Sequence, residues 1–211
     1  MGFTAFVLQH VPPPPARVVE VGCGELGGVV PALAAAGYDA IGVDPAAPAK
    51  AGYLRTDFRE LDGEFDAAVA GRVIHHLFPL DPSLDKLAAL APLLVVDEFA
   101  WDLIDPELQA WYEATYRDLP EPAGPPSLDE WRARHADELH SHGAVLAGLR
   151  ARYDELALEW LPYFPRWLRA DVDSPDRIGY RWVGLRRRLS TPPSGRAGLP
   201  RLRLRDQPPT P

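Results

Sequence analysis

The sequence is poor in the residues and runs that mark several large classes of protein. A single cysteine, Cys23, occurs in 211 residues, so an internal disulfide is excluded and a reducing compartment suits the chain. No apolar run is long enough to cross a bilayer, and the apolar start lacks the basic residues and cleavage site of a signal peptide. We therefore expect a cytoplasmic protein with no membrane partner.

Lysine is scarce in the chain, and acidic residues outnumber basic ones. The formal net charge is −8, and lysine occurs only at Lys50 and Lys86. An acidic protein does not attract nucleic acid, so no such partner is expected. His135, His140 and His142 have spacings that metal ligands can show, yet no cysteine or matched acidic partner accompanies them. We therefore predict no metal site.

The chain does contain a strand–turn–helix–strand segment between Arg17 and Asp44. A short valine-rich run leads to Gly22 and Gly24, which allow a tight turn and a close approach of the backbone to a ligand. An alanine-rich helical run then ends at Gly37, and a second apolar run ends at Asp44. This order predicts a βαβ unit, which binds a nucleotide at the carboxyl ends of its strands.

Glu20 decides which nucleotide is expected. Gly22, Gly24 and Gly27 satisfy G-x-G-x-x-G, and Asp44 follows at a spacing that permits NAD. A carboxylate at position 20 repels a pyrophosphate in a partly dry site, but it suits a ligand that carries cationic groups and no phosphate. An NAD(P)-dependent oxidoreductase remains the alternative, although the chain has no clear Tyr-x-x-x-Lys pair.

Glu20-Val21-Gly22-Cys23-Gly24 resembles the first motif of the class I methyltransferases that use S-adenosylmethionine (SAM). Later motifs of that family follow in order over roughly the first half of the chain: Asp57-Phe58, Phe65-Asp66 through His75-His76-Leu77, and Leu93 to Asp97. The chain departs from the family at Leu26, where a third glycine is usual, and at Pro92, where many relatives have a longer Pro-Gly-Gly turn.

The resemblance implies an α/β fold. The expected architecture is a Rossmann-like, seven-stranded, mostly parallel sheet with helices on both faces and an antiparallel last strand. The methyltransferase domain would span residues 1–189, with a helical insertion at about 100–153 between strands five and six. In the family this place usually carries the acceptor site or a lid. The Pro/Arg-rich residues 190–211 are expected to be disordered.

Local patterns predict where individual helices begin. In the first half, an amphipathic helix Phe3–His10 is expected over one edge of the sheet, and a helix capped by Ser83 is expected to run to Leu90. In the second half, one helix is expected to start at Asp105-Pro106-Glu107. Another, capped by Ser127 and Glu130, would carry Trp131 toward Leu139, and the last would run from His142 to Tyr153.

The resemblance also implies a donor site for SAM. Its expected residues are Glu20, Gly22, Cys23, Gly24, Asp44, Pro45, Asp57, Phe58, Gly71 and Arg72. Glu20 would orient the methionine end, which Gly71 and Arg72 would line, and Asp44 would accept the two ribose hydroxyls. Asp57 would bind the adenine amino group.

Two donor-site residues need a separate comment. Phe58 would flank the adenine ring, beside the amino group that Asp57 binds. Cys23 is interpreted as a small buried residue in the turn in preference to a catalytic thiol, because free cysteines are usually buried.

His75 and His76 are the candidates for a general base. On a helix they would point about 100° apart, so only one could face the site. A histidine near its ordinary pKa suits this role, and a packing role is the alternative.

We therefore predict a SAM-dependent methyltransferase acting on a small molecule, aromatic or apolar, with a slight preference for an oxygen nucleophile. The alternatives are the oxidoreductase and a non-catalytic SAM-binding regulator.

Overall fold

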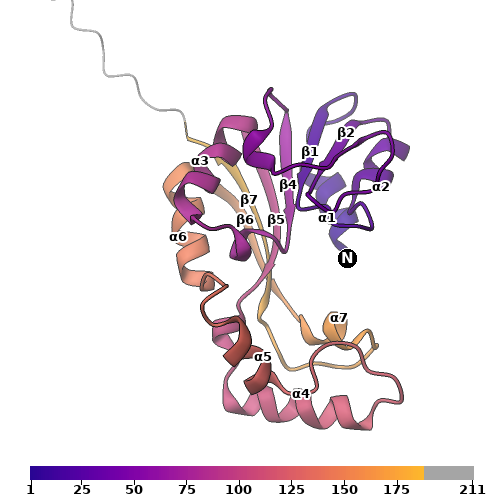
Figure 1. The fold of residues 1–211 in the computed structure, drawn as a ribbon, viewed down its shortest axis with the longest axis vertical. Coiled ribbons are helices and arrows are strands. Elements are labelled where there is room, and N and C mark those ends of the chain that lie inside the picture. Colours follow the sequence, from indigo (N-terminus) through magenta and orange to yellow (C-terminus); the bar gives the residue numbers. More distant parts are fainter. Residues whose placement is uncertain (188–211) are drawn as a thin grey trace, which may run out of the picture.

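The computed structural model describes residues 1–187 as a seven-stranded sheet between two layers of helices (Figure 1). The sheet has the order β3-β2-β1-β4-β5-β7-β6. Its strands are β1 (Arg17–Val21), β2 (Asp39–Val43), β3 (Tyr53–Leu54), β4 (Ala67–Gly71), β5 (Leu93–Phe99), β6 (Tyr153–Leu161) and β7 (Gly179–Arg186). The expected tail, residues 190–211, lies outside the described residues.

Strands β1 to β5 pair in parallel, whereas β7 lies antiparallel between β5 and β6. The predicted fold class is therefore confirmed, including the antiparallel last strand. Parallel pairing brings the carboxyl ends of β1, β2, β4 and β5 to one edge of the sheet, which is where ligands bind in such folds.

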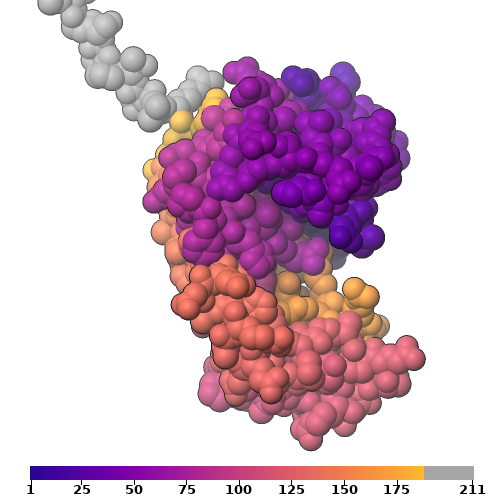
Figure 2. All heavy atoms as spheres, in the orientation of Figure 1, coloured from indigo at the N-terminus to yellow at the C-terminus, as the bar shows by residue number. Residues whose placement is uncertain are grey.

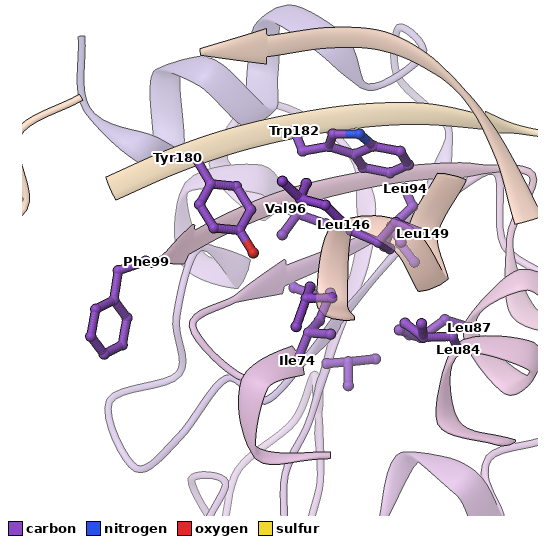
Figure 3. Packing of buried hydrophobic residues seen from close by; sticks show 14 of the residues in the cluster. Ile74, Leu84, Leu87, Leu94, Val96, Phe99, Leu146, Leu149, Tyr180 and Trp182 are labelled. Atoms are coloured by element: carbon purple, nitrogen blue, oxygen red, sulfur yellow. The ribbon is translucent and has the colours of Figure 1, made fainter. Parts of the chain in front are cut away.

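Helices cover both faces of the sheet. They are α1 (Phe3–His10), α2 (Val30–Ala35), α3 (Leu80–Leu90), α4 (Pro106–Asp118), α5 (Leu128–His135), α6 (His142–Arg152) and α7 (Phe164–Leu168). Alternate residues of β5 point to opposite faces. Leu94 and Val96 belong to a cluster that includes residues of α3 and α6, and Val95 to a second cluster that includes Phe6 and Leu33. Figure 3 shows part of the first cluster.

Helix α1 covers the centre of one face, so its predicted position at an edge is wrong. Phe6 and Val7 are fully buried. They share a cluster with Val69 of β4, Val95 of β5 and Val183 of β7. These central strands offer more apolar area than an edge strand does, and burying that area drives the helix there.

Two predicted helix boundaries are wrong, and three are confirmed closely. Helix α3 begins at Leu80, so Ser83 lies inside its first turn, where the hydroxyl donates to the Pro79 carbonyl at 2.8 Å and does not cap the helix. Helix α5 ends at His135 and does not reach Leu139. The remaining starts agree with the structure: Asp105 caps α4, Ser127 caps α5, and α6 starts at His142.

The helical insertion between β5 and β6 is confirmed, and the structure divides it. Helix α6 packs against α3 and β6 and belongs to the layer that covers the sheet. Helices α4 and α5 project beyond the edge where β5 ends, and α7 lies beside them (Figure 1). The part of the insertion that faces the carboxyl edge is therefore α4 and α5, joined by α7 from the β6–β7 connection.

The burial of α1 predicts a large effect of one substitution. Phe6→Ala should lower the free energy of unfolding by about 3–5 kcal/mol, because it leaves a cavity over β4 and β5. Leu8→Ala, on the more exposed side of the same helix, should change it by less than about 0.5 kcal/mol. Urea denaturation of both variants measures the difference, and equal effects would show that α1 is not a core element.

Candidate donor and acceptor site

The glycine turn after β1 leaves room at the carboxyl edge. Gly22 and Gly24 have φ of 76° and 61°, a region that favours glycine. A Cβ on Gly22 would lie 2.6 Å from the Val73 side chain, whereas a Cβ on Gly24 would meet nothing within 4 Å. Gly22 is thus required for packing, and Gly24 presents backbone to open space, as a ligand-binding turn requires.

Asp44 lies beside this turn, at the end of β2. Its carboxylate accepts hydrogen bonds from the amides of Gly24 (3.1 Å) and Ala46 (2.7 Å). The residue is half-buried, and Pro45 follows it on the surface. A carboxylate has about four lone-pair positions, so two remain for a diol. The position fits the predicted ribose-binding role.

Glu20 is buried, and its carboxylate accepts a hydrogen bond from the amide of Val29 at 2.7 Å. A Cβ at Gly28 would collide with this carboxylate. Glu20 therefore holds the second half of the glycine loop against the start of α2. Burial raises the pKa of Glu20 from 4.5 to about 7, against the opposing effects of the Val29 and Val30 amides and the charge of Arg72.

Cys23 lies inside the turn, 6% exposed. Burial, with the nearby carboxylates of Glu20 and Asp44, raises the pKa of its thiol to about 12. The thiol is therefore protonated at neutral pH and unreactive, in agreement with its interpretation as a buried packing residue.

The two residues predicted to contact the adenine, Asp57 and Phe58, lie in different surroundings. The Asp57 carboxylate lies at the surface and binds Arg59, whose Nε is 2.9 Å away, and this bond lowers the pKa of Asp57. Phe58 is only 5% exposed and packs in the core, so protein atoms cover most of its ring, and its contact with the adenine stays a prediction. Sequence reasoning missed Tyr53, whose hydroxyl donates to the Gly27 carbonyl at 3.1 Å.

Gly71 and Arg72 form the end of β4. A Cβ on Gly71 would lie 3.1 Å from the ring of Phe3, so α1 reaches this point. Arg72 is exposed and has φ of 57°, a costly conformation for a residue other than glycine. Its amide donates to the Asp97 carbonyl at 2.6 Å. Its charge lowers the pKa values of both Glu20 and Tyr163, which places the guanidinium within electrostatic reach of both residues.

His75 and His76 lie on a 3-10 helix, Ile74–His76. Their ring centres are 4.1 Å apart, yet the two side chains differ in exposure. His75 is buried, and its Nδ1 pairs with the carboxylate of Glu98, which also accepts the Ile74 amide at 2.7 Å. His76 is exposed, and partial desolvation with the charge of His75 lowers its pKa, so the imidazole is neutral at pH 7.

Asp97 is buried and pairs with two arginines from much later in the chain. Its carboxylate lies 2.5 Å from Arg166 of α7 and 3.2 Å from Arg181 of β7. These residues are 69 and 84 positions away in sequence, so no local pattern could reveal them.

An aromatic cluster, here called the aromatic wall, lies where β5 ends. We define it as Phe99, Trp131, Tyr163 and Trp167. The Phe99 ring stacks on Tyr163 at 4.4 Å and meets Trp167 at 5.5 Å and Trp131 at 6.0 Å. Figure 2 shows a hollow between the N-terminal half and the insertion, with α7 beside it. The wall therefore joins α5 and α7 to the end of β5.

The three histidines of the insertion each make a separate hydrogen bond. The His135 Nδ1 donates to the Trp131 carbonyl, the His140 Nε2 donates to the Leu77 carbonyl, and the His142 Nδ1 pairs with the Asp102 carboxylate. Within residues 1–187, no group of three or more His, Cys, Asp or Glu side chains is placed to hold a metal ion.

A surface hollow of about 1290 Å³ lies at the opposite end of the sheet. Pro92, Arg152 and Arg186 contribute to its lining, near the start of β5. None of the donor-site residues lines this hollow. The candidate donor site is therefore at the glycine loop and not here.

A family model described as a methyltransferase domain matches residues 3–166. The chain therefore belongs to the methyltransferase domain family, and it is a SAM-dependent methyltransferase. This assignment replaces the nicotinamide alternative. No curated protein matches the chain significantly. In the described residues, no helix combines the length and apolar character needed to cross a membrane.

Solved structures share the fold at low identity. The PH0226 protein of Pyrococcus horikoshii OT3 has TM-score 0.57 and 13% identity, with 87% of each chain covered. The 1,6-didemethyltoxoflavin-N1-methyltransferase of Burkholderia thailandensis, solved with its substrate and S-adenosylhomocysteine, has TM-score 0.57 and 18% identity, covering 87% of this chain and 76% of that one. The magnesium protoporphyrin IX methyltransferase of Synechocystis PCC 6803 has TM-score 0.54 and 15% identity, covering 87% and 80%.

The raised pKa of Glu20 predicts a pH dependence of stability. A pKa of about 7 in the folded state, against 4.5, corresponds to about 3 kcal/mol. Because the folded pKa is the higher one, this stability is present below pH 4.5 and is lost as the pH rises through about 7. Denaturant titrations should show wild type losing about 3 kcal/mol relative to Glu20→Gln between these limits. Parallel curves for the two proteins would contradict the raised pKa.

Asp44→Ala should weaken SAM binding at least about tenfold, because each charge-assisted hydrogen bond to the ribose contributes about 1.5–3 kcal/mol. Asp39→Ala is the matched control, since Asp39 is an exposed acid at the start of the same strand. Calorimetry with SAM measures both affinities. Unchanged affinity in a folded Asp44→Ala variant would mean that the ribose is held elsewhere.

Proposed function

We propose that this methyltransferase acts on a small aromatic molecule that binds against the aromatic wall. The observation that carries the proposal is the wall itself, which lies beside the carboxyl edge where the donor residues gather. Acceptor pockets are typically apolar with a few placed polar groups. Here the rings of Trp131 and Trp167 are half-buried, so part of each remains available to a ligand.

The residues of the donor edge fit SAM. Gly24 presents its backbone to open space, and Asp44 has lone pairs left for the ribose hydroxyls. Arg72 offers a cation for the carboxylate of the methionine end, with the Glu20 carboxylate nearby for its cationic groups. Leu26 is 94% exposed, so its replacement of the usual glycine does not block the turn.

SAM supplies an activated methyl group, and the protein must mainly position the acceptor and exclude water. The aromatic wall would orient a planar acceptor by stacking. Helices α4 and α5 would shield it from solvent. We propose an oxygen nucleophile because a neutral imidazole, His76, is available to take its proton. His75, buried and held by Glu98, would support the position of His76.

The direct test is turnover. The protein is incubated with SAM and a panel of phenols, aromatic amines and aliphatic alcohols, and mass spectrometry detects S-adenosylhomocysteine and the methylated product. Methylation of phenols supports the proposal. Product from aliphatic alcohols alone would contradict the aromatic acceptor, and SAM binding without product across the panel would favour a non-catalytic regulator.

Trp131→Ala should lower the turnover of an aromatic acceptor by about tenfold or more, because the lost ring contributes about 1–3 kcal/mol of stacking and apolar contact. The affinity for SAM should stay within about twofold, since Trp131 lies on the acceptor side. Trp160→Ala on β6, 39% exposed, is the control for loss of a tryptophan. A loss of SAM affinity equal to the loss of turnover would argue against a separate acceptor wall.

A further inference from the structure

The buried carboxylate of Asp97 holds one more positive charge than it can balance. Asp97 is 2% exposed, and two guanidiniums, those of Arg166 and Arg181, share it. Its neighbour Glu98 pairs with His75 and accepts the Ile74 amide, and within residues 1–187 it forms no ion pair with either guanidinium. Within the described residues, Asp97 is the carboxylate in direct contact with both guanidiniums, so the two cations share one ion-pair partner.

Arg181 is not the cation that a ligand could reach. It is 6% exposed. Its Nη1 donates to the Met1 carbonyl at 2.8 Å, and its guanidinium lies 5.4 Å from the centre of the Phe6 ring. These contacts satisfy Arg181 within the fold, where it serves as the fixed partner of Asp97.

Arg166 is different, since 40% of its side chain is exposed. Its Nη1 binds Asp97, and no hydrogen bond within residues 1–187 engages its Nε or Nη2. The planar fork of a guanidinium is suited to a second, bidentate carboxylate. Arg166 is also held close to the site, because it lies next to Trp167 of the aromatic wall.

Arg72 lies at the same place from the other side. Its amide binds the backbone carbonyl of Asp97, whose side chain binds Arg166. Burial raises the pKa of Tyr163, the charges of Arg72 and Arg166 lower it, and the smaller effects of Glu98 and Asp97 raise it. Tyr163 stacks on Phe99, so both guanidiniums lie within electrostatic reach of the aromatic wall.

Two available cations can satisfy two anionic groups. The methionine carboxylate of SAM suits Arg72, which is at the end of β4 and close to Glu20. We propose that Arg166 binds a carboxylate carried by the acceptor, so that the substrates are aromatic acids. This inference rests on the proposed function. The carboxylate serves as an anchor, while the ring stacks on the aromatic wall and a different atom is methylated.

An acidic ligand needs a local cation in order to bind to this protein. The whole chain has a net charge of −8, which repels organic anions in general. A bidentate pair with the partly exposed Arg166 would then select acids over isosteric neutral molecules, because a neutral molecule leaves the guanidinium without a second anionic partner.

Binding to the protein saturated with S-adenosylhomocysteine tests the inference without turnover. The probes are matched acid and amide pairs: 4-hydroxybenzoate with 4-hydroxybenzamide, and 6-hydroxy-2-naphthoate with its amide. Tryptophan fluorescence and calorimetry report the affinities at constant ionic strength. At least one acid should bind about tenfold or more tightly than its amide.

Arg166→Gln should reduce that preference to within about twofold, whereas Arg166→Lys, which keeps the charge, should retain part of it. Arg169→Gln, at the end of the same helix, is the matched control and should keep the full preference. Arg181 still pairs with Asp97 in every variant, and unchanged affinity for S-adenosylhomocysteine verifies that each one is folded.

The outcomes separate this inference from the proposed function. Equal binding of acid and amide in every pair, or a preference that survives Arg166→Gln, overturns the anchor at Arg166 while neutral aromatic acceptors remain consistent with the proposed function. Failure of wild type to bind S-adenosylhomocysteine overturns the donor site itself. A preference confined to proteins that keep Arg166 or Lys at this position supports the inference.

Discussion

Two neighbouring buried carboxylates at the end of β5, Asp97 and Glu98, hold the site together. Burying a carboxylate costs several kcal/mol unless cations and hydrogen-bond donors surround it. Because side chains alternate along a strand, the two point to opposite faces. Asp97 thus pairs with Arg166 of α7 and Arg181 of β7, whereas Glu98 pairs with His75 and accepts a hydrogen bond from the Ile74 amide. The end of β5 thereby holds three segments together: the β6–β7 connection, β7 itself and the turn after β4.

The donor side depends on a third buried carboxylate. Glu20 binds the amide at the start of α2 and thereby shapes the glycine loop between them. Burial of Glu20 in this position raises the pKa of its carboxyl group. A cationic ligand close by would favour the ionised form, so the loop is suited to a donor with positive groups. The same electrostatic argument disfavours a pyrophosphate, in agreement with the family to which the chain belongs.

The acceptor side is built from segments distant in sequence. Phe99 ends β5, Trp131 lies on α5, and Tyr163 with Trp167 belongs to the connection between β6 and β7. The wall and the charges next to it therefore exist only when β7 inserts between β5 and β6. Differences between methyltransferases of this fold can reside in such segments, while the donor edge stays the same.

The sequence by itself determined the βαβ unit, the glycine turn, the carboxylates Glu20 and Asp44 and most helix starts, because these depend on local periodicity and on residues close in the chain. Only the tertiary structure decided the rest. The motif that contains Phe58 does not reveal its burial in the core, and α1 lies over the central strands because apolar area is greatest there. Arg181 reaches Asp97 as its antiparallel strand partner, and Arg166 reaches it from α7 in the β6–β7 connection, and no local pattern encodes either contact.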